Sequence, residues 1–425
     1  MFLQLIETSD FKRYWLIQIW PDMDEIDVPS HFLCPISMEM MRDPVTVSTG
    51  ITYDRENIER WLFSCKNNSC PATKQVLSNT ELTPNHTLRR LIQAWCTLNA
   101  SHGIERIPTP KPPIEKVQIL KLIDEAKKLP NSQVLIYLRR LRSIAFENER
   151  SKRCLEEAGG VEFLASIVEN GNNDITVTEA AVEILSSLKT SETHLKNLLN
   201  NDGEFLESLT QVLRRGNFQS RAHITLLLKS IFEVADPIHL ISLKLEFFEE
   251  LGHVLDDQIS QQASKAALKI LMELCPWGRN RIKAVEGGAV PVLIELLIGS
   301  SDHRRFCELL LIVLDQLCGC AEGRAELLKH GAGMAIVSKK ILRVSHAASD
   351  RAVRILSSLC RFSATTRVLH EMLQLGVVSK LCLVLQVDSS LKTKERAREI
   401  LKLHSRVWKK SSCIPANLLS SYPSS

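Results

Sequence analysis

The chain has 425 residues and a formal net charge of +4, and 44% of its residues are hydrophobic. This composition excludes a disordered or collagen-like chain, and the small net charge gives no indication of a nucleic-acid-binding protein. Its 12 cysteines occur as scattered singles, which favours reduced thiols in a cytosolic or nuclear protein over a disulfide framework.

Residues 1–26 are predicted to be a disordered leader. The apolar stretch from Tyr14 to Trp20 is interrupted by Gln18, and no small-residue cleavage site follows it, so a secretory signal is not indicated. No segment of the sequence reaches the roughly 18 apolar residues that a membrane-spanning helix requires. We therefore expect no transmembrane segment.

Residues 27–101 are expected to form a small domain of mixed strands and helices. Segments 45–47 and 51–53 favour two short strands around a turn at Gly50. Asp54 is expected to cap a following helix through Ile58. A last helix carries apolar residues at helical spacing on one face: Leu88, Leu91, Ile92, Trp95 and Leu98.

The cysteines of this domain do not have the spacing of a zinc site. A RING-type site needs Cys or His in pairs two residues apart, repeated four times. At that spacing from Cys34 the chain has Ser37, and Cys65 and Cys70 enclose four residues with no histidine nearby. We expect no metal, and we interpret Cys34, Cys65, Cys70 and Cys96 as small buried thiols.

Six motifs in this domain occur in a characteristic order: Phe32-Leu-Cys-Pro-Ile-Ser37, Arg42-Asp-Pro-Val45, Thr49-Gly-Ile-Thr-Tyr-Asp-Arg55, Ile58-Glu-Arg-Trp-Leu62, Cys70-Pro71 and Leu82-Thr-Pro-Asn85. Together they resemble the U-box, which is similar in fold to a RING but holds its loops by hydrogen bonds and salt bridges in place of zinc. The resemblance covers the whole domain.

The resemblance implies a docking function without covalent catalysis on this chain and without a cofactor. A ubiquitin-conjugating enzyme (E2) would dock on Ile36, Trp61, Pro71 and Ala72. For Trp61, docking and a place in the core stay equally open. Lys74 matches a basic position that contacts both ubiquitin and E2, but arginine is frequent there, and a solvated surface lysine is the alternative. The implied structural polar network consists of Asp43, Tyr53, Asp54, Arg55 and Asn85.

Residues 102–113 are predicted to be a proline-rich linker, because residues 108–113 contain four prolines and should be extended. The following 114–410 is poor in proline and rich in helix-forming residues. Its apolar helix blocks recur at residues 141, 184, 226, 270, 313, 355 and 400, which are 42–45 residues apart. Glycines that precede an apolar helix at the same period can adopt the left-handed backbone conformation.

This period resembles the armadillo repeat, although HEAT repeats have a similar length. We expect a mainly α chain, in which a zinc-free, RING-like α+β U-box precedes a right-handed α-solenoid of about seven armadillo-type repeats. Its groove would bind a protein substrate. Armadillo-type import receptors carry a ladder of Trp and Asn, which this sequence lacks, so that function is disfavoured.

The end of the array is basic. Segment 392–410 has eight Lys or Arg against Glu395 and Glu399. We interpret it as the solvated face of a capping helix, with an acidic partner or an anionic lipid surface as the alternatives. Residues 411–425 are serine-rich and expected to be disordered.

The order of U-box and armadillo repeats resembles the plant U-box E3 ubiquitin ligases, in particular a stress- and immunity-linked subgroup whose members begin near a Met like Met23. The resemblance implies a ligase that binds E2, ubiquitin and substrate, acts in defence and abiotic-stress signalling, and is located in the cytoplasm, with the nucleus left open. Homodimer and monomer both occur among U-boxes. The alternative function is a non-enzymatic scaffold with an inactive U-box.

Overall fold

The computed structural model describes residues 27–64, 67–107, 116–170, 174–188, 190–199, 203–241, 243–300, 303–408 and 422. The predicted leader, residues 108–113 of the linker and the serine-rich tail other than Tyr422 lie outside the described residues, as does Cys65. The chain divides into two compact units, with the division in the sequence after Pro113. Each unit has a separate hydrophobic core.

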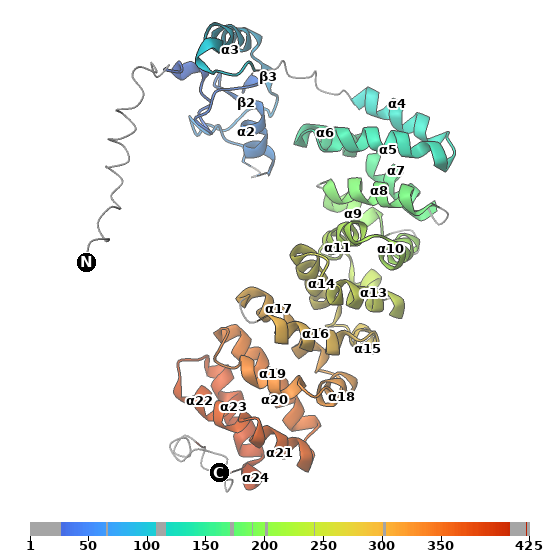
Figure 1. Cartoon of the computed structure of the whole chain (residues 1–425), viewed down its shortest axis with the longest axis vertical. Helices are drawn as coiled ribbons and strands as arrows, with labels where there is room; N and C mark the ends of the chain where they lie inside the picture. The colour runs from blue at the N-terminus through green and yellow to red at the C-terminus, as the bar shows by residue number, and fades with distance from the viewer. Residues whose placement is uncertain are drawn as a thin grey trace, which may run out of the picture. The chain divides into compact units, whose positions relative to one another are not determined.

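The first unit is built around a three-stranded antiparallel sheet in the order β2-β1-β3. Figure 1 labels β2 and β3 beside α2 and α3. Val45 in the central strand pairs with Tyr53 on one side and Pro84 on the other. The two strands predicted around Gly50 are confirmed, and Gly50 has a φ of 82°. The elements are η1 (Ser30–Phe32), β1 (Pro44–Thr46), β2 (Thr52–Asp54), α2 (Arg55–Glu59), the π-helical turn η2 (Arg60–Ser64), β3 (Thr83–Pro84), α3 (His86–Leu98) and η3 (Ala100–His102).

Helix α3 differs from the expectation of one apolar, core-facing side. Ile92 is buried and Trp95 packs partly against the core, but Leu91 is 53% exposed and Leu98 is 80% exposed. The sheet is too small to cover all of a 13-residue helix. Part of the apolar stripe of α3 therefore faces solvent.

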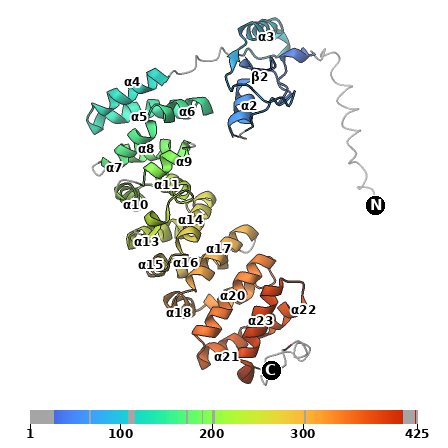
Figure 2. The ribbon, with the colours of Figure 1, turned by 180° about the vertical axis from the view of Figure 1, so that it is seen from behind.

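The second unit is an array of helices that follow one another in chain order (Figures 1 and 2). After the pair α4 and α5 come six triplets, and α24 follows the last. The helices are α4 (Lys116–Lys127), α5 (Asn131–Ala145), α6 (Glu149–Glu157), α7 (Gly160–Asn170), α8 (Ile175–Ser187), α9 (Glu192–Asn197), α10 (Glu204–Arg215), α11 (Phe218–Phe232), α12 (Pro237–Ile241), α13 (Leu245–Asp256), α14 (Gln261–Leu274), α15 (Gly278–Glu286), α16 (Ala289–Gly299), α17 (Arg304–Leu317), α18 (Ala321–Lys329), α19 (Gly333–Lys340), α20 (His346–Phe362), α21 (Thr366–Gln374), α22 (Val377–Gln386), α23 (Leu391–Leu403) and α24 (Ser405–Trp408).

The seven predicted repeat positions each fall in one helix of a continuous row, α5, α8, α11, α14, α17, α20 and α23, which we call the ladder. Each ladder helix packs against the next. Most of them begin at a polar cap residue whose side chain accepts a backbone N–H, for example Asn217 from Ser220 at 2.9 Å and Ser260 from Ala263 at 3.1 Å. The armadillo-type repeat is therefore confirmed at the level of single helices.

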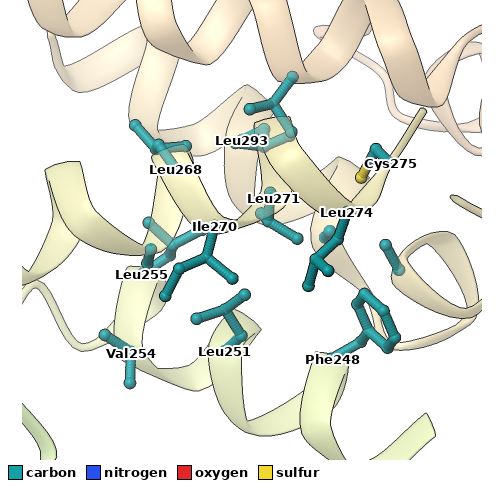
Figure 3. Packing of buried hydrophobic residues seen from close by; sticks show 14 of the residues in the cluster. Phe248, Leu251, Val254, Leu255, Leu268, Ile270, Leu271, Leu274, Cys275 and Leu293 are labelled. Atoms are coloured by element: carbon teal, nitrogen blue, oxygen red, sulfur yellow. The ribbon is translucent and has the colours of Figure 1, made fainter. Parts of the chain in front are cut away.

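The repeats share one core because each buries its apolar faces only against its neighbours. In the middle of the array, Leu251 and Leu255 of α13 lie against Ile270 and Leu271 of α14, with Leu293 of α16 beyond (Figure 3). The predicted left-handed glycines are confirmed at Gly159, Gly203, Gly288 and Gly376. At Gly333 the reason for a glycine is lack of space, because a Cβ there would lie only 2.1 Å from the carbonyl oxygen of Leu327.

No single described helix is both long and apolar enough to cross a membrane. The bent pair α21 and α22 passes the length and composition criteria only when the two helices are taken together.

Candidate functional site: paired loops on the first unit

Two loops of the first unit have the same sequence pattern and the same backbone. Loop 1 (residues 34–39) and loop 2 (residues 70–75) both begin Cys-Pro and carry Ser or Thr as the fourth residue. In loop 1 the N–H of Met38 donates to the carbonyl of Cys34, and in loop 2 the N–H of Lys74 donates to that of Cys70. Met38 and Lys74 both have a φ of 59°. The two loops are therefore structural copies of each other.

The thiols at the start of these loops are held by hydrogen bonds. The Sγ of Cys34 accepts the N–H of Asp54 at 3.3 Å, and the Sγ of Cys70 lies 3.0 Å from the hydroxyl of Tyr53. Burial alone would raise the pKa of the Cys70 thiol, but hydrogen bonds from Thr49, Thr73 and Tyr53 lower it to about 6. Burial also raises the pKa of Tyr53, which therefore keeps its proton at neutral pH.

Both loops are tied to the same helical segment, formed by α2 and η2. The Nδ2 of Asn57 donates to the hydroxyl of Ser37 in loop 1 at 3.1 Å. The indole Nε1 of Trp61 donates to the carbonyl of Ser69, directly before loop 2, at 2.7 Å. These bonds fix both loops to one helical segment, which therefore positions them relative to each other.

The residues predicted for docking have different exposures. Ile36, Trp61 and Pro71 are half-buried, and Ala72 is exposed. Trp61 packs partly against the core, which is one of the two alternatives left open for it, and its docking role stays a prediction. The Nζ of Lys74 lies 5.5 Å from the centroid of the Trp61 ring, which is the range of a cation–π contact.

Sequence reasoning missed Met38 in this arrangement. Its side chain is 69% exposed, two residues after Ile36. A large apolar side chain at that exposure adds to the apolar surface beside Ile36. The signal was present in the sequence, because Met38 in loop 1 stands where Lys74 stands in loop 2.

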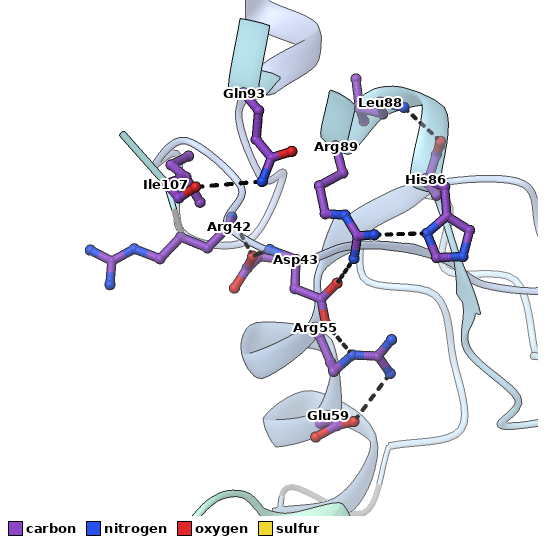
Figure 4. A network of polar contacts seen from close by, with 11 residues as sticks. Arg42, Asp43, Arg55, Glu59, His86, Leu88, Arg89, Gln93 and Ile107 are labelled. Atoms are coloured by element: carbon purple, nitrogen blue, oxygen red, sulfur yellow. Dashed lines mark hydrogen bonds and ion pairs between the residues drawn. The ribbon is translucent and has the colours of Figure 1, made fainter. Parts of the chain in front are cut away.

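A charged network joins Asp43 to residues of α2 and α3 (Figure 4). Asp43 pairs with the Nε of Arg55 at 2.6 Å and lies 3.9 Å from the Nη1 of Arg89, and Arg55 lies 3.7 Å from Glu59. Arg89 also donates to the imidazole of His86 at 3.0 Å. Arg89 was not predicted, because its distance from Asp43 in the sequence gives no signal of contact. Glu59 was missed although it lies four residues after Arg55 on one helix, a spacing at which such side chains meet.

Asp54 does not cap α2 as predicted. Its Oδ1 accepts the N–H of Arg42 at 2.8 Å and that of Asp43 at 2.9 Å, and no side-chain bond to the helix is present. The carboxylate is drawn to these two amides because the turn before β1 leaves them without strand partners. Asp54 therefore holds the chain that follows loop 1.

Asn85 and Tyr53 join the remaining parts. The Oδ1 of Asn85 accepts the N–H of Leu88 and so caps α3, and its Nδ2 donates to the hydroxyl of Thr52 on β2 at 3.3 Å. The N–H of Ala72 in loop 2 donates to the hydroxyl of Tyr53 at 3.1 Å. The five polar residues thus connect both loops, the sheet and α3.

The ladder of the second unit carries its own polar ties between repeats. Arg142 of α5 pairs with Glu183 of α8 at 2.8 Å, and Arg361 of α20 pairs with Glu399 of α23 at 2.6 Å. Between α11 and α14 a pocket of about 160 Å³ is lined by apolar residues and by Lys and Glu: Lys229, Phe232, Glu233, Lys269, Ile270, Met272 and Glu273. The ladder therefore carries charged side chains next to an apolar pocket.

Comparison with known proteins agrees with both units. The family profile described as U-box domain matches residues 28–101, and that described as Plant U-box protein ARM repeat region matches residues 118–424. The chain is 60% identical over 404 residues to E3 ubiquitin-protein ligase PUB23 of Arabidopsis thaliana, covering 94% of this chain and 98% of that one. It is 56% identical over 432 residues to E3 ubiquitin-protein ligase PUB22 of the same plant, covering 94% and 99%.

One solved structure shares its fold with most of this chain. A chain from a structure of the interaction between cadherin and beta-catenin superimposes with a TM-score of 0.56 and 14% identity, covering 77% of this chain and 58% of that one. The family profiles span both units in the predicted order, and the two Arabidopsis relatives match over nearly their whole length. The chain belongs to the plant U-box, armadillo-repeat family of E3 ubiquitin ligases.

Proposed function

We propose that the U-box docks a ubiquitin-loaded E2 on the surface formed by loop 1, loop 2 and Trp61, and promotes direct transfer of ubiquitin to a substrate lysine. The observation that supports this best is the pair of matching loops tied to one helical segment by Asn57 and Trp61. Ile36 and Met38 supply apolar contacts from loop 1, and Pro71 and Ala72 supply them from loop 2. A few apolar side chains around one aromatic residue are a common anchor for a partner protein.

The chain need supply no nucleophile for this reaction, because the thioester is on the E2. The E2–ubiquitin thioester breaks at its C–S bond, an isopeptide bond forms to the substrate lysine, and the E2 thiol leaves. The U-box would accelerate this step by holding the mobile ubiquitin in reactive orientations. Lys74 would take part as a point charge at the edge of the docking surface. Its ammonium group is already held over the Trp61 ring.

We propose that the ladder of the armadillo region selects the substrate. Its exposed charged groups and the pocket between α11 and α14 support this assignment. The resemblance extends the proposal to defence and abiotic-stress signalling, to a cytoplasmic location with the nucleus open, and to a homodimer or a monomer. Proximity labelling in plant cells with an Ile36→Ala version, which should retain substrates without modifying them, tests the substrate assignment.

A discharge assay tests the docking and transfer step. A purified E2 is loaded with ubiquitin, the loading is stopped, and free lysine is added with or without the full-length chain. We expect the wild-type chain to accelerate thioester loss for at least one E2 of a panel, and Ile36→Ala to lose that acceleration. Leu98→Ala is the matched control, because Leu98 is 80% exposed on the same unit but lies on α3. Equal acceleration by Ile36→Ala, or none by the wild type with any E2, contradicts the proposal.

A further inference from the structure

The last ladder helix, α23, has one flank with no ladder helix beside it. Toward α20 it makes several side-chain contacts: Thr393 and Arg396 bond to Asp350, and Glu399 pairs with Arg361. Each ladder helix from α8 to α20 packs between two others, whereas α23 packs against α20 alone in this row. Tyr422 is buried and donates its hydroxyl to the carbonyl of Leu401 at 2.7 Å, so it covers part of α23 near its last turn. The remainder of the flank opposite α20 is the place where a further repeat would stack.

That flank carries a row of positive charge. At 3.6 residues per turn, Lys394, Arg398 and Lys402 lie one above another, on the side of α23 away from Arg396 and Glu399. We call these three residues the basic row. Arg398 and Lys402 are exposed and Lys394 is half-exposed. Among the described residues, no ion pair includes any of the three.

The need for a polar cap does not explain a row of a single sign. The first helix of the array, α4, also has an open side, and there Asp124 and Glu125 alternate with Lys121 and Lys127, all exposed. A mixed surface therefore suffices to end the array. The sequence that follows α24 contains no negative charge that could neutralise the row, because residues 409–425 have two lysines and no Asp or Glu.

The spacing of the basic row fits a helix of the opposite charge. Residues four apart on a helix are separated by about 6 Å along the axis, so carboxylates at the same spacing on a partner helix can face all three cations. Leu391, which precedes the basic row on the same helix, is 80% exposed and offers an apolar contact to such a helix. Glu395 is exposed between Leu391 and Arg398 and would repel a uniformly anionic lipid or nucleic-acid surface.

We propose that the basic row binds an amphipathic acidic helix of a partner protein, which stacks on α23 as a further helix of the ladder. This surface is separate from the E2 docking surface on the U-box. Its occupant extends the array in the way that one repeat extends another, with ion pairs in place of most of the apolar core.

Binding of synthetic peptides to the full-length chain tests the proposal. The probe is a labelled helical peptide with Glu at four-residue intervals and Leu on the adjoining face, and the comparison peptide has Lys in place of every Glu. Fluorescence anisotropy is measured for the wild type, for Lys394→Glu/Arg398→Glu/Lys402→Glu, and for the matched control Lys121→Glu/Lys127→Glu/Lys128→Glu, whose residues lie on α4 and directly after it. Thermal melting checks that all three proteins are folded, and Lys394→Ala/Arg398→Ala/Lys402→Ala replaces the reversal variant if it is not.

We expect the acidic peptide to bind the wild type and the control alike, with at least a tenfold loss of affinity for the basic-row variant and for the wild type at high salt. The lysine peptide should bind neither the wild type nor the control. Equal affinity of the wild type and the basic-row variant overturns the proposal. So does binding of the wild type to phosphatidylserine vesicles in the absence of binding to the acidic peptide, which would assign the row to a membrane. Thioester discharge by the basic-row variant should equal that of the wild type, and this separates the result from the docking proposal.

Discussion

Met38 and Lys74 occupy the same position in two loops of one conformation. Both have a φ of 59°, and each donates its N–H to the carbonyl of the cysteine four residues earlier. The side chains at these matched positions differ in character, because Met38 is apolar and Lys74 is cationic. The proposed docking surface therefore has an apolar side chain at this position of loop 1 and a charged one at this position of loop 2.

Substitution of Lys74 should change transfer more than docking. Lys74→Ala removes the cation beside Trp61, and we expect slower discharge of ubiquitin with an unchanged affinity for the free E2. Lys74→Arg should at least preserve the rate, because a guanidinium group can bridge two acceptors where an ammonium group acts as a point charge. Single-turnover discharge and E2 binding are measured on the same proteins. If Lys74→Ala discharges at the wild-type rate, Lys74 is a solvated surface lysine.

Loss of Asp43 should destabilise the U-box. Its partner Arg55 has a side chain that is only 15% exposed, so Asp43→Ala leaves a largely buried cation with Glu59 as its nearest remaining partner. We expect a cost of about 1–3 kcal/mol, in the range of a broken, partly buried ion pair. Hydrogen exchange at the β1 amides of the full-length chain reports it.

Glu56→Gln is the matched control for Asp43→Ala. It removes the pair with Arg60, whose side chains are 77% and 64% exposed, and such pairs contribute at most about 1 kcal/mol. Equal protection of β1 in Asp43→Ala and Glu56→Gln would show that the Asp43 network does not stabilise the fold.

Glu59 should make the stability of the U-box depend on pH. Burial raises its pKa above the ordinary value, and the attraction of Arg55 offsets this only in part. The folded state therefore holds the proton to higher pH than the unfolded state does. The contribution of Glu59 to stability is greatest below the ordinary glutamate pKa and is lost as pH rises through the raised value.

Glu59→Gln removes this dependence, because glutamine stays neutral. We expect the variant to be at least as stable as the wild type at pH 7.5, with a flatter stability profile between pH 4.5 and pH 7.5. Hydrogen exchange of the β1 amides, corrected for the intrinsic effect of pH, gives the comparison. A variant that is less protected than the wild type at pH 7.5 would show that the ion pair with Arg55 outweighs the burial of Glu59.

The sequence predicted the repeats well because their signals are local and recur. Apolar pairs such as Ile270–Leu271 mark each ladder helix. In four of the triplets, the glycine before the middle helix has the positive φ that its position requires. The gaps in the prediction are contacts between distant residues. Asp43 and Arg89 are 46 positions apart, and nothing in the sequence indicates that they meet.

The U-box also showed where a local rule is overridden. Asp54 stands at the cap position of α2, yet its carboxylate bonds to Arg42 and Asp43 because those amides have no strand partner. Leu91 and Leu98 follow the apolar spacing of α3 but exceed the area that a three-stranded sheet can cover. In both cases the sequence pattern predicts that a helix forms. Contacts with the rest of the unit decide whether a side chain caps the helix, is buried or stays exposed.

The affinity of the full-length chain for a ubiquitin-conjugating enzyme, with and without the Ile36 side chain, tests the central claim most directly. The E2 used is the one most active in the discharge assay, and binding is measured by interferometry for the wild type, Ile36→Ala and Leu98→Ala. We predict that Ile36→Ala weakens binding by roughly 1–3 kcal/mol, or about one to two decades in Kd, while Leu98→Ala changes it little. Equal affinities of the wild type and Ile36→Ala would contradict docking on the paired loops.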